Sequence, residues 1–297
     1  MYKQIAANRQ KTFFLIFGFL VLIIAVGYFA SVYWDSPDIL LGAVVLSVGM
    51  SWGSYFAGDK TILALSGARP VRHDTDIKQM QIVHLVENLC ITAGLPVPKV
   101  YLVNDPAPNA FAVGRDPKHA SIALTTGIIE KLDKTELEGV IAHELSHVKN
   151  YDILISTVVV TLLGVVTLLA DWIWRGRMFS SGSRNHDNNA NGILLLIGLI
   201  FIILAPIFAQ LIYLAISRQR EYLADASGAL LTRYPEGLAN ALTKLDTDKT
   251  QLRFANRATA GLYIVDPFKK IKKGMEEAWS THPPLQKRIA ALMQMNI

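Results

Sequence analysis

The chain has 297 residues, of which 52% are hydrophobic and 18% are charged, and its formal net charge is +5. Soluble domains average about 25% charged residues, so the composition predicts membrane segments and excludes collagen, coiled coils, disulfide scaffolds and disordered chains. The single cysteine, Cys90, cannot form an internal disulfide. Because no nucleic-acid motif accompanies the positive charge, we expect attraction to a lipid bilayer and no nucleic acid as a partner.

Four apolar stretches predict four transmembrane helices, at residues 12–34, 39–57, 153–174 and 192–217. Each is long enough to cross a bilayer, which takes about 20 helical residues. Basic residues precede the first stretch, so the positive-inside rule puts the N-terminus in the cytoplasm. The arginine excess of loop 175–191 does not fit this topology. It leaves open the alternative that the last two stretches form a buried or only partly inserted hairpin.

The apolar pattern divides the chain into three parts. Residues 1–57 form an N-terminal tail with two transmembrane helices. Residues 58–152 and 218–297 together form one cytoplasmic domain. Residues 153–217 form a transmembrane hairpin, whose loop 175–191 we expect to be flexible because it is rich in Ser, Asn and Gly.

The cytoplasmic domain has the pattern of an α+β fold with a small mixed sheet. Helical apolar spacing predicts a helix over residues 74–90, which Gly94 and Pro96 end. Short β-prone runs predict strands over residues 99–103, 110–113 and 121–125. A further helix is predicted over residues 132–151, with Thr135 and Glu138 as a possible capping box.

The helix predicted over residues 132–151 carries the sequence HELSH at 143–147. A spacing of four residues puts His143 and His147 on one helical face, where both imidazoles can bind one Zn²⁺. Glu144 beside them can act as a general base on water. The alternative is a pair of surface histidines on an amphipathic helix.

A third zinc ligand can be sought by elimination. There is no glutamate between Leu145 and Arg220, and Asp152 would lie about 140° round the helix from His147. The first carboxylate after the last apolar stretch is Glu221. Asp225 follows one helical turn later, where it can orient a ligating imidazole. The alternative for both acids is a solvated helix face paired with nearby arginines.

Five stretches resemble those of HtpX-type membrane zinc metalloproteases, which are relatives of the CAAX prenyl endopeptidases: SGARPV (66–71), AGLPVPKVYLVNDPAPNAFAVGRD (93–116), TTGIIEKLDKTELEGVIAHELSHVKNYDI (125–153), SRQREYLADASGALLT (217–232) and STHPPLQKRIA (280–290). The resemblance implies a gluzincin-like zinc protease domain with one Zn²⁺ per chain. It implies His143, His147 and Glu221 as ligands, Glu144 as the catalytic base, and an active site that faces the cytoplasm.

Two further parts of the site are predicted. A hydrogen-bond donor should face the oxyanion that develops on the substrate carbonyl. His282 is the first candidate for this catalytic role and Arg288 the second, and the alternative is an ordinary helix start at Pro283 and Pro284. An edge strand should bind the extended peptide through its backbone; an ordinary hairpin strand is the alternative for its residues, Asn109, Ala110, Phe111 and Ala112.

These features together predict a zinc metalloendopeptidase in the cell membrane, a multi-pass protein with its catalytic domain in the cytoplasm. Its expected partners are the bilayer and protein or peptide substrates, above all misfolded or damaged membrane proteins. A prenyl-peptide (CAAX-type) processing protease is one alternative function, and an inactive membrane adaptor is another.

Overall fold

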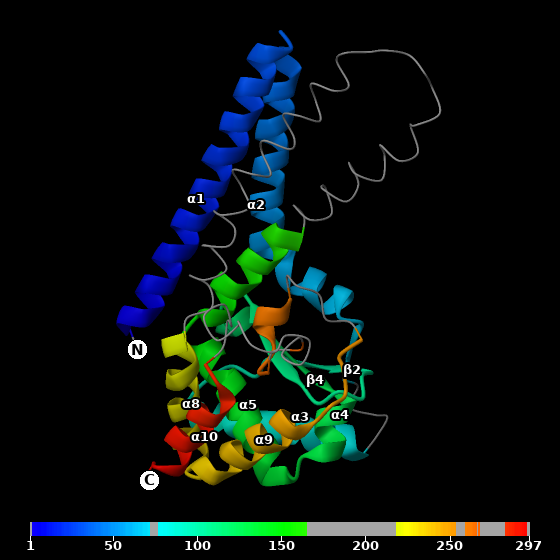
Figure 1. Ribbon diagram of the computed structural model, residues 1–297, viewed down its shortest axis with the longest axis vertical. Helices are drawn as coiled ribbons and strands as arrows, with labels where there is room; N and C mark the ends of the chain where they lie inside the picture. The colour runs from blue at the N-terminus through cyan, green and yellow to red at the C-terminus, as the bar shows by residue number, and fades with distance from the viewer. Residues whose placement is uncertain are drawn as a thin grey trace.

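The computed structural model describes residues 2–71, 77–164, 218–253, 259–265, 267 and 283–295. Two long helices rise from one side of an α+β domain (Figure 1). These are α1 (Tyr2–Tyr33) and α2 (Pro37–Leu65), which pack against each other along their lengths. Both are long and apolar enough to cross a membrane. Large side chains such as Phe29 and Trp52 are exposed on them, which suits contact with lipid.

The described residues contain two such helices and not the four that the sequence analysis predicts. The third predicted stretch, 153–174, is described only in part, as a shorter apolar helix Asp152–Gly164. Its side chains Ile155, Val158 and Leu162 pack against Leu15 and Phe19 of α1. The fourth predicted stretch, 192–217, and the loop 175–191 lie outside the described residues.

The domain contains a four-stranded mixed sheet, in the order β1-β2-β4-β3. Its strands are β1 (Ala68–Pro70), β2 (Lys99–Val103), β3 (Ala110–Gly114) and β4 (Ala120–Thr125). Strands β2 and β4 are parallel and the other pairs are antiparallel. Three strands match the prediction to within a residue. The sequence analysis misses β1, which is only three residues long and ends in proline, so it has no alternating pattern to detect.

Helices α4 (Thr126–Lys131) and α5 (Lys134–Lys149) contact the sheet. Helices α3 (Ile77–Ala93), α8 (Arg218–Thr232) and α9 (Pro235–Thr247) pack against α5, and α10 (Leu285–Met293) packs against α8 and α9. Buried side chains of α5, including Val140 and Ile141, join Ile122 and Leu124 of β4 in the main hydrophobic core. The α+β fold with a small mixed sheet is therefore confirmed.

The capping box of α5 differs from the predicted one. Asp133 accepts a hydrogen bond from the backbone of Glu136, and the Glu136 side chain accepts one from the backbone of Asp133. The predicted pair, Thr135 and Glu138, is wrong because α4 ends at Lys131 and leaves Asp133 free to cap the next helix. The Thr135 hydroxyl instead donates to the Asp133 carboxylate.

A close approach between α5 and α8 brings the motif helix next to the chain that follows the apolar hairpin. At Gly228 a Cβ atom would lie only 3.0 Å from the backbone nitrogen of His143. Glycine is required where backbones approach this closely. The contact brings the first turn of α8, with Glu221, beside the histidines of α5.

Candidate metal centre

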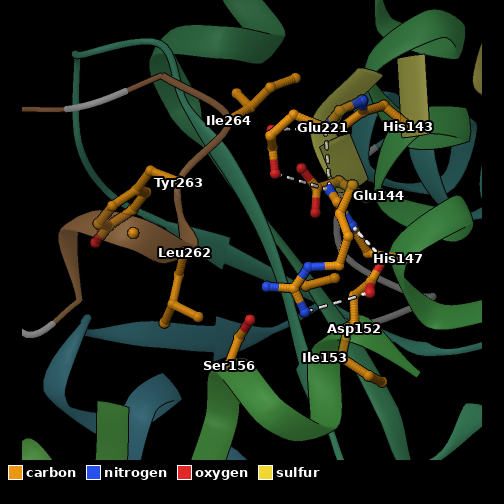
Figure 2. A pocket seen from close by; sticks show the side chains of 13 residues that line it. His143, Glu144, His147, Asp152, Ile153, Ser156, Glu221, Leu262, Tyr263 and Ile264 are labelled. Carbon is orange, nitrogen blue, oxygen red and sulfur yellow. Dashed lines mark hydrogen bonds and ion pairs between the residues drawn. The ribbon is translucent and has the colours of Figure 1, made fainter. Parts of the chain in front are cut away.

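Three side chains from α5 and α8 converge at one point (Figure 2). His143 and His147 lie one turn apart on α5, and their Nε2 atoms are 3.2 Å from each other. The carboxylate oxygens of Glu221 lie 3.8 Å from Nε2 of His143 and 3.6 Å from Nε2 of His147. One ligand atom from each residue lies within 4.8 Å of the others. The predicted ligand set is thus brought together.

The orientation and surroundings of the two imidazoles fit the binding of a metal ion. Each Nδ1 atom faces a carboxylate, Asp225 at 3.0 Å from His143 and Asp152 at 3.1 Å from His147. When each Nδ1 carries its proton toward the neighbouring carboxylate, as in a metal-binding imidazole, the two Nε2 lone pairs point toward each other. At 3.2 Å they repel unless a cation lies between them. Two imidazole nitrogens and one carboxylate are the ligands of catalytic zinc sites with an open fourth position.

The charge of the surrounding groups also fits a divalent cation. Four buried carboxylates and two guanidinium groups surround the histidines: Glu144, Asp152, Glu221 and Asp225 with Arg220 and Arg288. In the charge state that a bound cation favours, with all four carboxylates ionised and both imidazoles neutral, the cluster has an excess of two negative charges. Buried charges require partners of opposite sign, and one Zn²⁺ supplies them.

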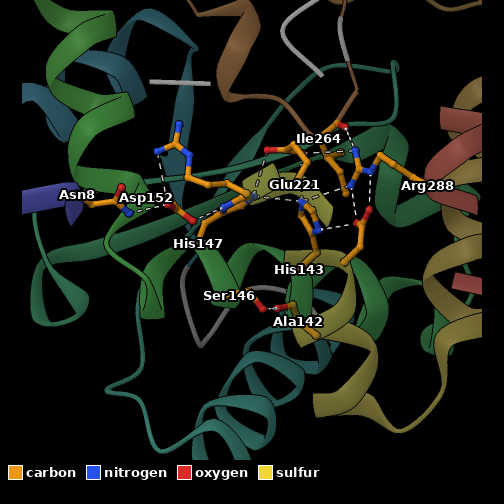
Figure 3. A network of polar contacts seen from close by, with 11 residues as sticks. Asn8, Ala142, His143, Ser146, His147, Asp152, Glu221, Ile264 and Arg288 are labelled. Carbon is orange, nitrogen blue, oxygen red and sulfur yellow. Dashed lines mark hydrogen bonds and ion pairs between the residues drawn. The ribbon is translucent and has the colours of Figure 1, made fainter. Parts of the chain in front are cut away.

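Asp225 and Arg288 support the imidazole of His143, and Figure 3 shows Arg288 close to that ring. Arg288 is fully buried and donates to both oxygens of Asp225, at 2.8 and 2.7 Å. It also donates to the carbonyl of Ile264 at 3.1 Å and lies 3.6 Å from Glu221. Burial acts to raise the pKa of Asp225, but Arg288 outweighs it and holds that pKa below its usual value.

Of the two predicted oxyanion donors, neither is found in the described pocket. Arg288 is held by Asp225 and Ile264 and is not among the residues that line the pocket. His282 lies outside the described residues. A cation that does line the pocket is Arg220, which precedes Glu221 and lies 3.5 Å from Asp152. The sequence analysis treats arginines at this point only as partners of a solvated helix face.

Asp152 contacts the zinc site, although the sequence analysis predicts that it lies on a different face of the helix from His147. That prediction assumes a helix continuous through residue 151. In the structure α5 ends at Lys149, and Tyr151 has a φ of 60°. The break folds the chain back, so the Asp152 carboxylate reaches Nδ1 of His147 at 3.1 Å. Asn150, a residue type that often follows helix ends, is the signal that could have suggested this break.

Glu144 lies between the ligands and the sheet. Its side chain is buried and lines the pocket with Ala112. Burial raises the pKa of Glu144 to about 7, against the lowering effect of His147. The carboxylate is thus next to both the ligands and the edge strand.

The predicted peptide-binding strand is the edge strand β3, and part of its outer edge is already paired. The Ile264 N–H donates to the carbonyl of Ala110 at 3.1 Å, and the Asn109 side chain donates to the carbonyl of Val265 at 3.0 Å. Phe111 packs against the ring of Tyr263. Of the four predicted residues, Ala112 alone lines the pocket. The pocket there is partly open, and its space for water-sized molecules is about 30 Å³.

Comparison with known proteins gives the same picture. The sequence model of Peptidase family M48 matches residues 76–296. A protease HtpX homolog of Dictyoglomus thermophilum is 43% identical over 295 residues, which cover 99% of this chain and 94% of the relative. One of Caldanaerobacter subterraneus is 44% identical, with 100% and 98% covered. The crystal structure of S. mikatae Ste24p has a similar fold, with a TM-score of 0.51, 19% identity, and 98% of this chain and 67% of that chain covered.

Proposed function

Because the chain belongs to peptidase family M48 and has a zinc site formed by His143, His147 and Glu221, we propose that it is a membrane-anchored endopeptidase that cleaves misfolded or damaged membrane proteins. Its activity as an M48 zinc metallopeptidase follows from the family and the ligand set. The proposal adds the substrate class, the residues that carry the reaction and the side of the membrane.

The roles proposed for the side chains follow from where they lie. Bound zinc supplies Lewis-acid activation of the carbonyl and of water. Glu144 takes a proton from the water that attacks the peptide carbonyl and then delivers it to the leaving amine. Asp225 holds the ring of His143 through Nδ1. His282 remains the proposed oxyanion donor, since Arg288, the other predicted donor, does not line the described pocket.

The proposed substrate is an extended segment of chain, and the edge strand β3 supports this. Backbone pairing with an edge strand requires an unfolded peptide. On β3, Ala112 lines the pocket next to Glu144. The backbone carbonyl of Ala110 is not free for a peptide, because it accepts a hydrogen bond from Ile264. We propose that the peptide binds at Ala112 with little side-chain selectivity.

The proposed role at the membrane is supported by the contact between the zinc site and the apolar helices. Asp152, which contacts His147, is the first residue of the apolar helix Asp152–Gly164, and this helix packs against α1. The site therefore lies at the end of a membrane-type helix pair. Unfolded segments of membrane proteins close to the bilayer are the chains most easily reached from there.

We further propose the full topology. It has four membrane spans, a tail with two spans at residues 1–57, a hairpin at residues 153–217, and a cytoplasmic protease domain from residues 58–152 and 218–297. Single cysteines introduced at Ser36 and Ser183 in a Cys90→Ser background test it. An impermeant maleimide should label both from outside intact cells, and a cysteine at Lys134 only after lysis. Labelling of Lys134→Cys in intact cells would contradict the topology.

The substrate class is tested with the full-length protein in lipid vesicles. One membrane protein is prepared with a cytoplasmic domain that is either folded or destabilised by mutation, and the destabilised domain is also prepared without its membrane anchor. We expect rapid cleavage of the anchored, destabilised form and its loss with a chelator. Equal cleavage of all three forms, or cleavage of a prenylated peptide alone, would contradict the proposal.

A further inference from the structure

Asn8, near the start of α1, is buried against the loop that follows the zinc-binding helix. Only 4% of Asn8 is exposed, although it lies outside the first predicted apolar stretch. Its side-chain amide donates to Oδ1 of Asp152 at 2.7 Å and to the carbonyl of Asn150 at 3.0 Å (Figure 3). Both amide hydrogens are therefore used, and both acceptors flank the break after α5.

The two oxygens of Asp152 are divided between α1 and the zinc site. Oδ1 accepts from Asn8, whereas Oδ2 lies 3.1 Å from Nδ1 of His147. Arg220 makes a longer contact, at 3.5 Å, with Oδ1. A carboxylate held at one oxygen can rotate, but one held at both has a fixed plane. Asn8 thus determines the direction from which Asp152 meets the imidazole.

A second contact between α1 and the same break involves Arg9 and Tyr151. The guanidinium carbon of Arg9 lies 4.6 Å from the centre of the Tyr151 ring, and the side chain also donates to the Tyr151 hydroxyl at 3.1 Å. Tyr151 has a positive φ, which is unusual for a bulky residue and requires support from its surroundings. Two consecutive residues of α1 thus hold the three residues of the break.

We propose that Asn8 is a positioning residue of the zinc site, which fixes the Asp152 carboxylate and through it the imidazole of His147. The first apolar helix is then a part of the metal centre as well as an anchor. A shift of α1 relative to α5 changes the orientation of a zinc ligand. This inference depends on the zinc site alone and goes beyond the proposed substrate class.

Zinc affinity of the full-length protein in detergent, measured by competition with a chromogenic chelator, tests the proposal. Loss of a partner of a metal ligand typically weakens binding by 10- to 100-fold. Asn8→Ala should weaken zinc binding by about tenfold, the low end of that range, because Asn8 acts through Asp152. The visible absorption spectrum of the Co²⁺-substituted protein should change as well. Asn8→Asp, which keeps the shape and places a charge beside Asp152, should weaken binding further.

Thr12→Val is the matched control. Thr12 is buried one turn along α1, and its hydroxyl donates only to the backbone carbonyl of Asn8. This variant should keep the zinc affinity and the Co²⁺ spectrum of the parent, although it also removes a buried hydrogen bond. If Thr12→Val and Asn8→Ala weaken zinc binding equally, the effect is general destabilisation of α1 and the proposal is wrong.

A double-mutant cycle separates positioning from folding. In an Asp152→Ala background Asn8→Ala should cause no further loss of zinc affinity, because the group through which Asn8 acts is absent. An undiminished tenfold loss in that background would overturn the proposal. So would parental zinc affinity and an unchanged Co²⁺ spectrum in Asn8→Ala or in Asn8→Asp. Each of these outcomes leaves the assignment of the zinc ligands intact, since none of them changes a ligand.

Discussion

The guanidinium of Arg288 donates two hydrogen bonds to the carboxylate of Asp225, at 2.7 and 2.8 Å, and both side chains are buried. Asp225 in turn lies 3.0 Å from Nδ1 of His143. The C-terminal helix α10 therefore supports the zinc site through one arginine, far from the motif in the sequence. Two parallel hydrogen bonds between a guanidinium group and a carboxylate form a strong and directional interaction.

Arg288→Met should destabilise the protein strongly, because it leaves Asp225 and Glu221 buried without their cation. Removal of one partner of a buried ion pair costs about 3 to 5 kcal/mol. The thermal unfolding of the purified protein, followed by tryptophan fluorescence, measures the effect. Arg288→Lys keeps the charge but loses the paired hydrogen bonds. Its Tm should lie between the Tm of the parent and that of Arg288→Met. An unchanged Tm in Arg288→Met would show that the pair contributes little.

Gly228→Ala should lower the affinity for zinc by separating two helices. Its Cβ atom would lie 3.0 Å from the nitrogen of His143 and 3.2 Å from the carbonyl carbon of Ala142, so α8 must move away from α5. Glu221 then moves away from the histidines. Ser227→Ala, at the neighbouring position, is the control and should bind zinc as the parent does. Equal affinities in both variants would mean that the close contact does not set the ligand distances.

Glu221→Ala should reduce the zinc content of the purified protein. The two histidines remain, but a site with two ligands holds zinc much more weakly than a site with three. Elemental analysis after dialysis measures the zinc content, and added zinc should restore only part of the activity. Full zinc content and full activity in this variant would mean that the third ligand is misassigned, with Asp225 or His282 as the next candidate.

Replacement of residues 153–217 with a short flexible linker should lower zinc affinity and activity even if the remaining protein folds. The described start of this segment contacts both the site and the sheet, since Ile153 and Ser156 line the pocket and Thr157 accepts a hydrogen bond from the N–H of Gly114 at 3.1 Å. Deletion of residues 180–189 alone should have almost no effect. Parental zinc binding and casein cleavage by the linker variant would show that the hairpin is a simple tether.

The parts of the site that depend on local spacing could be predicted from the sequence. His143 and His147 lie one turn apart on one helix, and Glu221 is the first glutamate after them outside the apolar stretches. Asp225 lies one turn beyond Glu221, and its carboxylate lies 3.0 Å from Nδ1 of His143. The three longer strands were found because their β-prone residues lie between clear turn signals.

The parts that depend on tertiary contacts could not be predicted. Asp152 reaches His147 because the helix breaks at Tyr151, and a periodic pattern carried through the break gives the wrong direction. Asn8 belongs to a basic tail and becomes buried only when α1 packs beside Asn150. The outer edge of β3 is partly filled by Ile264, a residue more than a hundred positions later in the chain.

The central claim is that this protein hydrolyses peptide bonds with zinc and with Glu144 as the base. The most direct measurement is the rate of casein cleavage by purified Glu144→Gln, with zinc content determined on the same sample. The account predicts about one zinc ion per chain, as in the parent, and a rate lower by about 10²- to 10⁴-fold, the usual contribution of a general base. Cleavage by Glu144→Gln at the parental rate, or by a parent protein that contains no zinc, would contradict it.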